Sequence, residues 1–226
     1  MTAKAPSERT RVKRAFVRAT YERDAVYAIL DAQPLCHVGY VKDGHPFVTP
    51  TFQWREGDRV YWHGSSASQA LRAAKSARVC LTVSCLDGFV MARSGFHHSV
   101  NYRSAMILGE AEIVEDEAAK VKHLDTFIDG LFPGQSGLIR PMNTQEKKAT
   151  TVLSMPIEEY SAKIRGEGPI DDEEDYALPI WAGVIPVHQT VGEPIPDPRN
   201  LPDVEMPDCI RDFRMAQAQQ WDPAKD

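Results

Sequence analysis

The chain has 226 residues, a net charge of −6 and a pI near 5.7. This length suits one domain with its own core, and the acidic balance argues against a general nucleic-acid binder, which carries a basic surface. No apolar run is as long as a membrane span, and no apolar segment follows the basic N-terminus as it would in a signal peptide. We therefore expect a soluble cytoplasmic protein whose four cysteines are free thiols.

Short apolar segments separated by turn residues fill the first half of the chain. Helical spacing of apolar residues predicts a helix over Arg23–Ala32, which Pro34 ends. Alternation and turn residues predict strands at Leu35–Val41, Phe47–Trp54, Arg59–His63, Val79–Cys85 and Phe89–Arg93. The last two strands would be joined by a turn at Asp87-Gly88, and residues 63–75 would lead from a strand into a helix.

A long alternating strand follows. One face carries Ala105, Ile107, Ala111 and Ile113, and the other carries Ser104, Met106, Leu108, Glu110 and Glu112. The second face is small or apolar where it begins and acidic where it ends. This pattern indicates a barrel strand whose flank meets a partner. Gly109 predicts a bulge or a sharp bend.

The remaining elements complete a mainly β pattern. Apolar spacing predicts a helix from Asp116, its N-cap, to Phe132, and a short helix around Gln145–Ala149. Strands are expected at Thr151–Met155 and Leu178–Val187, and residues 171–175 form an acidic run expected to be a solvated loop. Six to seven antiparallel strands with flanking helices indicate the α+β class. The chain then divides into a basic leader (1–20), a barrel domain (21–187) and an extended proline-rich tail (188–226).

Two polar segments are candidate ligand sites. The sequence His63-Gly64-Ser65-Ser66-Ala67-Ser68 offers backbone N–H groups and three hydroxyls at a helix start, which suits phosphate; an ordinary capped helix explains it equally well. A second polar cluster, Ser99 to Ser104, precedes the long strand. His97 and His98 point to opposite sides of an extended chain and have no third ligand at a metal-site spacing, so no metal site is predicted.

Four segments, YWHGSSAS, GFVMARSGFHHSVNYRSAMILGEA, SAKIRGEGP and PIWAGVIP, occur in an order that resembles the flavin-nucleotide-binding branch of the pyridoxamine 5′-phosphate oxidase-like superfamily. This branch includes the nitroimidazole-resistance flavoproteins. The resemblance implies a split β-barrel homodimer with FMN at the subunit interface. Carried over by position, it implies these cofactor contacts: Thr49, Pro50, Thr51, Phe52, Tyr61, Trp62, His63, Ser65, Ser68, Asn101, Tyr102, Arg103, Ser104, Lys163, Arg165 and Trp181.

The resemblance also implies a redox function. We expect an FMN-dependent oxidoreductase that reduces a small planar substrate with nicotinamide-derived electrons, as a nitroreductase does, with His63 as a proton donor. Ser-Ser-Ala-Ser-Gln stands where pyridoxamine phosphate oxidases carry basic residues, and their terminal arginine–histidine segment is missing, which disfavours pyridoxamine oxidation. Two alternatives remain open: a flavin-binding carrier or sensor without turnover, and a split barrel that binds haem through its histidines.

Overall fold

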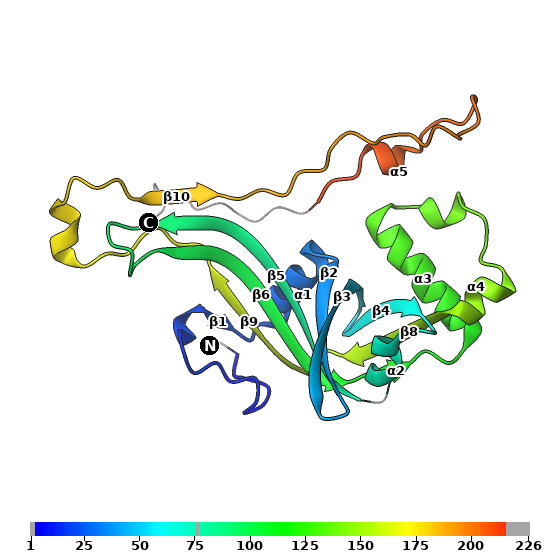
Figure 1. Ribbon diagram of the computed structural model, residues 1–226, viewed down its shortest axis with the longest axis horizontal. Helices are drawn as coiled ribbons and strands as arrows, with labels where there is room; N and C mark the ends of the chain where they lie inside the picture. Colours follow the sequence, from blue (N-terminus) through cyan, green and yellow to red (C-terminus); the bar gives the residue numbers. More distant parts are fainter. Residues whose placement is uncertain (1–2, 76, 216–226) are drawn as a thin grey trace.

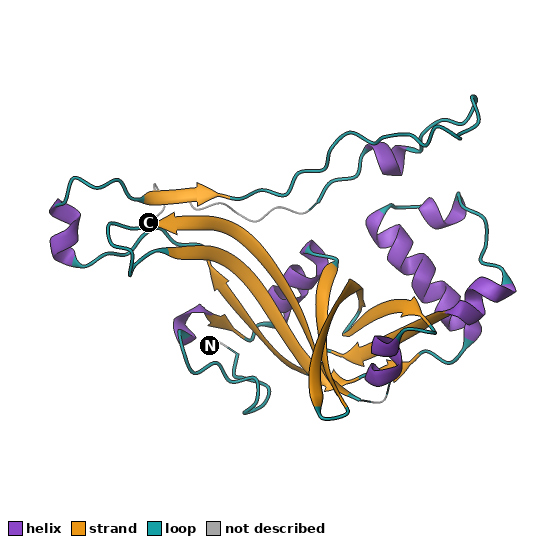
Figure 2. Cartoon of the chain, viewed as in Figure 1, coloured by secondary structure: helices purple, strands orange, loops and turns teal. Residues whose placement is uncertain are grey.

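The computed structural model describes residues 3–75 and 77–215. Its strands form one antiparallel sheet that curls into a barrel, and two long strands run out of the barrel to one side (Figure 1). The helices lie around the flanks of the sheet (Figure 2). The expected fold, an α+β and mainly β split barrel, is confirmed. Residues 1–2 of the leader and 216–226 of the tail lie outside the described part of the chain.

The strands pair in an order that differs from their order along the chain. This order is β1 (Ala19–Thr20), β9 (Glu159–Arg165), β6 (Ser99–Glu110), β5 (Arg78–Met91), β2 (Leu35–Lys42), β3 (His45–Glu56), β4 (Arg59–Ser65), β8 (Thr150–Pro156) and β7 (Glu112–Ile113), while β10 (Gly183–Pro186) pairs with β5. The helices are α1 (Arg23–Ala32), α2 (Gln69–Ala74), α3 (Glu117–Leu131), α4 (Thr144–Ala149) and α5 (Asp208–Arg211), with 3-10 turns at η1 (Phe16–Arg18), η2 (Gln135–Gly137) and η3 (Glu173–Ala177).

An apolar core fills the barrel. Val26, Ile29 and Leu30 recur at helical spacing, so α1 buries all three against the sheet. In β6, Ala105 and Ile107 point into the same core. Burying a large aliphatic side chain contributes about 1.5–3 kcal/mol. The predicted alternation of this strand is confirmed. On its other face, Ser104, Met106 and Leu108 are only half-buried in the single chain.

The turn expected at Asp87-Gly88 is wrong. The segments on both sides of it form one strand, β5, which shifts register against β6 between Leu86 and Gly88. Gly88 is needed for a close approach rather than a turn, because a Cβ there would lie 3.1 Å from the carbonyl oxygen of Ile185 in β10. No bulge occurs at Gly109, which pairs regularly with Val79. The single strand expected to continue through Ile113 instead ends at Glu110, and the next strand, β7, pairs with β8.

Two other expectations are corrected. Gly109 makes room for Met155, whose sulfur would lie 2.7 Å from a Cβ at that position. The strand expected at Leu178–Val187 is reduced to β10, because only these four residues pair with β5. Asp116 caps α3 as expected, and its carboxylate accepts from the Ala119 N–H at 2.7 Å.

The terminal segments contain little regular structure. Residues 188–206 are exposed throughout and have no helix or strand, as expected for a proline-rich tail. Among the described residues, no helix is both long enough and apolar enough to cross a membrane.

The four cysteines are free, and burial raises the pKa of the Cys36 thiol to about 12.

Candidate functional site

His63 lies in β4 at the edge of an aromatic cluster. Its ring centroid is 5.9 Å from that of Trp54 in β3 and 5.4 Å from that of Phe127 in α3. Phe52 approaches Phe127 at 6.4 Å, and half of its surface is exposed. Strand alternation places His63 on this aromatic side, whereas the neighbouring Trp62 points into the barrel core. His63 thus lies beside an aromatic wall that is open on one side.

The imidazole of His63 has a buried nitrogen without a partner. Nδ1 is inaccessible to solvent and has no hydrogen bond among the described residues. Leaving a buried polar atom unbonded costs about 1–3 kcal/mol. Burial also lowers the pKa of His63 from its ordinary value of 6.5. At neutral pH the ring is therefore neutral, which is the form that binds metals.

A small cavity lies behind His63, between β2, β3, β4 and α2. It has a volume of about 170 Å³. Its lining includes the predicted contacts Thr49, Pro50, Thr51, Trp62, His63 and Ser68. Thr51 donates its hydroxyl to the carbonyl of His63 at 3.4 Å, which links β3 to β4 at this point. The structure thus gathers these six predicted residues around one cavity.

The loop after β4 satisfies much of its own polar capacity. Ser68 is the N-cap of α2 and accepts from the Leu71 N–H at 3.5 Å, and the Ser65 hydroxyl accepts from the Ala67 N–H at 3.2 Å. The Nε of Arg72 donates to the Ser66 carbonyl at 3.1 Å. This loop therefore forms an ordinary capped helix start. Tyr61 lies apart from the loop and stacks on Trp54 at 5.6 Å.

The remaining predicted residues form a second group, on β6 and β9. Arg103 donates through Nε and Nη2 to the two carboxylate oxygens of Asp87, each at 3.0 Å, and this pairing raises the pKa of Arg103. Arg165 is buried and donates to the amide oxygen of Asn101 and to the Gly168 carbonyl at 2.8 Å. Both guanidinium groups are thus bonded within the chain, while the buried Nε of Arg165 has no partner among the described residues.

Tyr102, Ser104, Lys163 and Trp181 belong to the same end of the molecule. Tyr102 stands opposite Arg165 and Ser104 opposite Lys163 in the register of β6 with β9. Trp181 is 68% exposed and its ring covers Gly183, where a Cβ would lie 2.9 Å from it. Because β5 and β2 separate β6 from β3 in the pairing order, one chain does not join this group to the His63 cavity.

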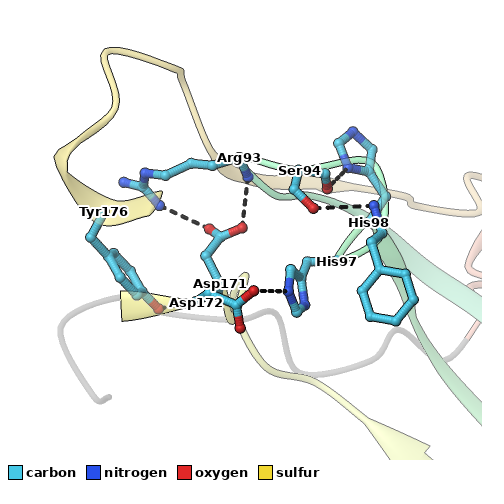
Figure 3. A network of polar contacts seen from close by, with 8 residues as sticks. Arg93, Ser94, His97, His98, Asp171, Asp172 and Tyr176 are labelled. Atoms are coloured by element: carbon cyan, nitrogen blue, oxygen red, sulfur yellow. Dashed lines mark hydrogen bonds and ion pairs between the residues drawn. The ribbon is translucent and has the colours of Figure 1, made fainter. Parts of the chain in front are cut away.

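A network near the second group was not anticipated from the sequence (Figure 3). Asp171 was expected in a solvated loop, but its side chain is fully buried and accepts from the Arg93 backbone N–H at 2.8 Å and from Arg93 Nη1 at 3.0 Å. Burial pushes the pKa of Asp171 up, yet these bonds outweigh it and leave the pKa lowered. Nearby, His97 contacts Asp172 at 3.3 Å. The network fastens residues 171–172 to the end of β5.

Phe127 and Trp54 are the functional neighbours that sequence reasoning missed. Phe127 lies three residues after Leu124, so helical spacing alone places it on the inner side of α3. Trp54 is next to a predicted contact strand but was not singled out. Among the described residues, no group of three or more His, Cys, Asp or Glu side chains gathers as a metal cluster. A metal group held here by protein side chains would therefore rely on one or two ligands.

Comparisons with known proteins place the chain among flavin-binding barrels. The family model described as pyridoxamine 5′-phosphate oxidase matches residues 22–164. The structure of the flavocytochrome Anf3 from Azotobacter vinelandii is 55% identical, with a TM-score of 0.92 over 95% of this chain and 100% of that one. The FAD and heme binding protein from Mycobacterium smegmatis is 34% identical, with a TM-score of 0.84 over 88% of this chain and 98% of that one.

A more distant likeness concerns the fold alone. A candidate 5-nitroimidazole antibiotic resistance protein from Bacteroides thetaiotaomicron is 20% identical, with a TM-score of 0.55 over 65% of this chain and 86% of that one. No curated protein matches the chain. The family match covers more than half of the sequence, and the two nearer structures extend it over most of the rest. The chain belongs to the pyridoxamine 5′-phosphate oxidase-like family of flavin-binding split barrels.

Proposed function

We propose that this chain is a redox protein that binds both a flavin and a haem, and that His63 is a ligand of the haem iron. Two relatives support the pair of cofactors, because one is named a flavocytochrome and the other an FAD and heme binding protein. The observation that carries the assignment to His63 is its buried, unpartnered Nδ1 beside an aromatic wall. A single histidine is enough to hold a haem iron.

The residues around His63 fit a haem in two respects. The side chains of Phe52, Trp54 and Phe127 provide an apolar surface for a planar macrocycle and exclude water from the iron ligand. The lowered pKa of His63 keeps the imidazole neutral at pH 7, so a lone pair is available for the iron. The same lowered pKa makes a histidinium proton donor a poorer assignment than a metal ligand.

The flavin would lie in the cleft at Thr49, Pro50 and Thr51, as the family resemblance implies. We favour FAD over the FMN first expected. The support for FAD is that a 34% identical relative is named an FAD and heme binding protein.

We further propose that the protein works as a homodimer. A second copy would bring the outward residues Ser104 and Lys163 toward the flavin cleft of the first, which one chain does not do by itself. A bound flavin could take two electrons from a nicotinamide donor and release them one at a time, and a bound haem would accept them singly, so a protein with both could connect such a donor to a one-electron acceptor. The chain's own part is to hold the two groups and to keep water away from His63.

The test is the absorbance spectrum of holoprotein variants. In His63→Ala we expect the haem Soret band to be lost while the flavin bands remain, and added imidazole should restore haem binding. His98→Ala is the matched control, because His98 is exposed and only bonds the Ser94 carbonyl at 2.8 Å. A Soret band of unchanged position and intensity in His63→Ala would reject His63 as the ligand.

A further inference from the structure

The two terminal segments lie at opposite edges of one sheet layer. In this layer the strands run β1, β9, β6, β5 and β10. Neighbouring strands are about 4.8 Å apart, so β1 and β10 are separated by roughly 19 Å. The basic leader enters at the β1 edge and the C-terminal arm, defined as residues 188–215, leaves from the β10 edge (Figure 1). The leader and the arm of one chain are thus kept apart.

The leader presents cations and exposed apolar side chains together. Residues 3–22 contain six basic residues and two acidic ones. Phe16 and Val17 are 70% and 79% exposed. They help to line a hollow of about 1070 Å³ together with Arg11 and Lys13. Glu8 and Glu22 also line the hollow, and Glu8 lies 3.6 Å from Arg11 and 3.7 Å from Lys13. Lys4 adds a third cation to the lining, so an apolar and acidic occupant would suit it.

The arm has this complementary character. Between Val191 and Met206 it carries four acidic residues and one arginine, and that arginine pairs with Asp197. Ile195 is 94% exposed and Leu201 is 72% exposed. An extended and exposed segment that is acidic and apolar suits the hollow in the leader.

In the structure the arm runs away from the leader of its own chain, and it is attached at both ends (Figure 1). At its start, the Val187 N–H donates to the Asp87 carbonyl at 3.0 Å. At its far end, Phe213 packs on Phe132 after α3 with ring centroids 4.7 Å apart. Both attachments lie away from β1. Gln189, near the start of the arm, also accepts from Gln33 Nε2 at 3.4 Å, whereas residues 191–206 are exposed along their whole length.

We propose that the arm of one protomer docks in the leader hollow of a second copy of this chain, and reciprocally. The inference rests on the proposed homodimer and adds the contact that would clasp it. If two copies packed their sheets face to face, related by a two-fold axis parallel to the strands, each β1 edge would lie over the partner's β10 edge. Oppositely charged segments would then meet twice in the dimer.

The decisive experiment is cysteine cross-linking between differently tagged chains that are co-expressed. One chain carries Val17→Cys and the other Ile195→Cys. We expect a disulfide-linked mixed dimer after mild oxidation, and none when Ile195→Cys is replaced by Val41→Cys, a site on the β2–β3 hairpin that is 63% exposed. No mixed cross-link, or a cross-link only within a chain that carries both cysteines, would overturn the docking.

Sedimentation velocity separates this inference from the proposed function. If the wild type sediments as a dimer but gives no cross-link, the proposed homodimer stands and the docking of the arm in the leader hollow is rejected. If the wild type sediments as a monomer, both proposals are rejected.

Charge reversal gives an independent check. Arg11→Glu with Lys13→Glu should weaken the dimer by on the order of tenfold at low salt, and Glu193→Lys with Glu205→Lys should restore it. Lys147→Glu with Lys148→Glu on α4 is the control. Equal weakening by the control, or binding of the wild type to phosphatidylserine vesicles without any cross-link, would contradict the proposal.

Discussion

The two ends of the molecule use polar groups in opposite ways. At the end of the long β5–β6 pair, the guanidinium groups of Arg93, Arg103 and Arg165 are held by Asp171, Asp87 and Asn101. At the barrel end, His63 has a buried nitrogen with no partner among the described residues. The buried Nε atoms of Arg93 and Arg165 also lack a partner among the described residues, but both guanidinium groups are bonded within the chain through their terminal nitrogens. His63 has no such bond on its buried nitrogen, and its ring lies beside an aromatic wall that is open on one side. A gap in the hydrogen bonding therefore indicates a binding site only where a surface that can receive a ligand lies beside it.

The two ends should also differ most in how much they stabilise the fold. Leu81 is fully buried in the barrel core, so Leu81→Ala should lower the free energy of unfolding by about 2–5 kcal/mol. Phe96, at the far end of the β5–β6 pair, is 91% exposed. Phe96→Ala should therefore change the free energy of unfolding by less than about 0.5 kcal/mol. Urea unfolding of the two variants measures both. Equal losses would mean that the far end is as well packed as the barrel.

Arg165 tests whether the polar cluster at the end of the β5–β6 pair is structural. Arg165→Met removes the donor to Asn101, Glu167 and Gly168, and should lower the free energy of unfolding by about 2–4 kcal/mol because buried acceptors are left unpaired. We expect bound flavin to be retained at saturating concentration. Lost flavin with unchanged stability would instead make Arg165 a cofactor contact, as first expected.

The smallest effect is the pH dependence due to His63. Its native pKa is lowered, so below pH 6.5 the unfolded chain takes up a proton before the native protein does. The free energy of unfolding of the apoprotein should therefore fall as the pH drops from 6.5 toward the native pKa, by at most about 1.4 kcal/mol per pH unit. The difference between wild type and His63→Phe isolates this contribution. A difference that is constant over pH 4 to 8 would contradict it.

The barrel could be predicted from the sequence because its signals are local. The period-two alternation of β6 and the Asp116 cap of α3 depend on neighbouring residues, and both are found where expected. The Asp87-Gly88 turn was wrong because the same dipeptide also allows a bulge beside an approaching strand, and only the pairing with β10 decides between them. Burial of Asp171 likewise depends on Arg93, which lies 78 residues away in the chain.

The site was predicted in part for the same reason. His63 and the Thr49–Thr51 segment lie around one cavity, and adjacent strands bring them together. The contributions of Phe127 and Trp54 depend on how α3 packs across the sheet, which no local pattern specifies. The choice between an anion loop and a capped helix also needed the structure, because both have the same residues at the same spacing.

The most direct test is the visible spectrum of the purified wild-type protein, with its released cofactors identified by mass. We expect a Soret band and flavin bands together, and release of haem and FAD in equal amounts. Flavin without haem, even after haem is supplied, would contradict the assignment of His63 and leave a simple flavoprotein. A protein that binds neither cofactor would contradict the proposed function as a whole.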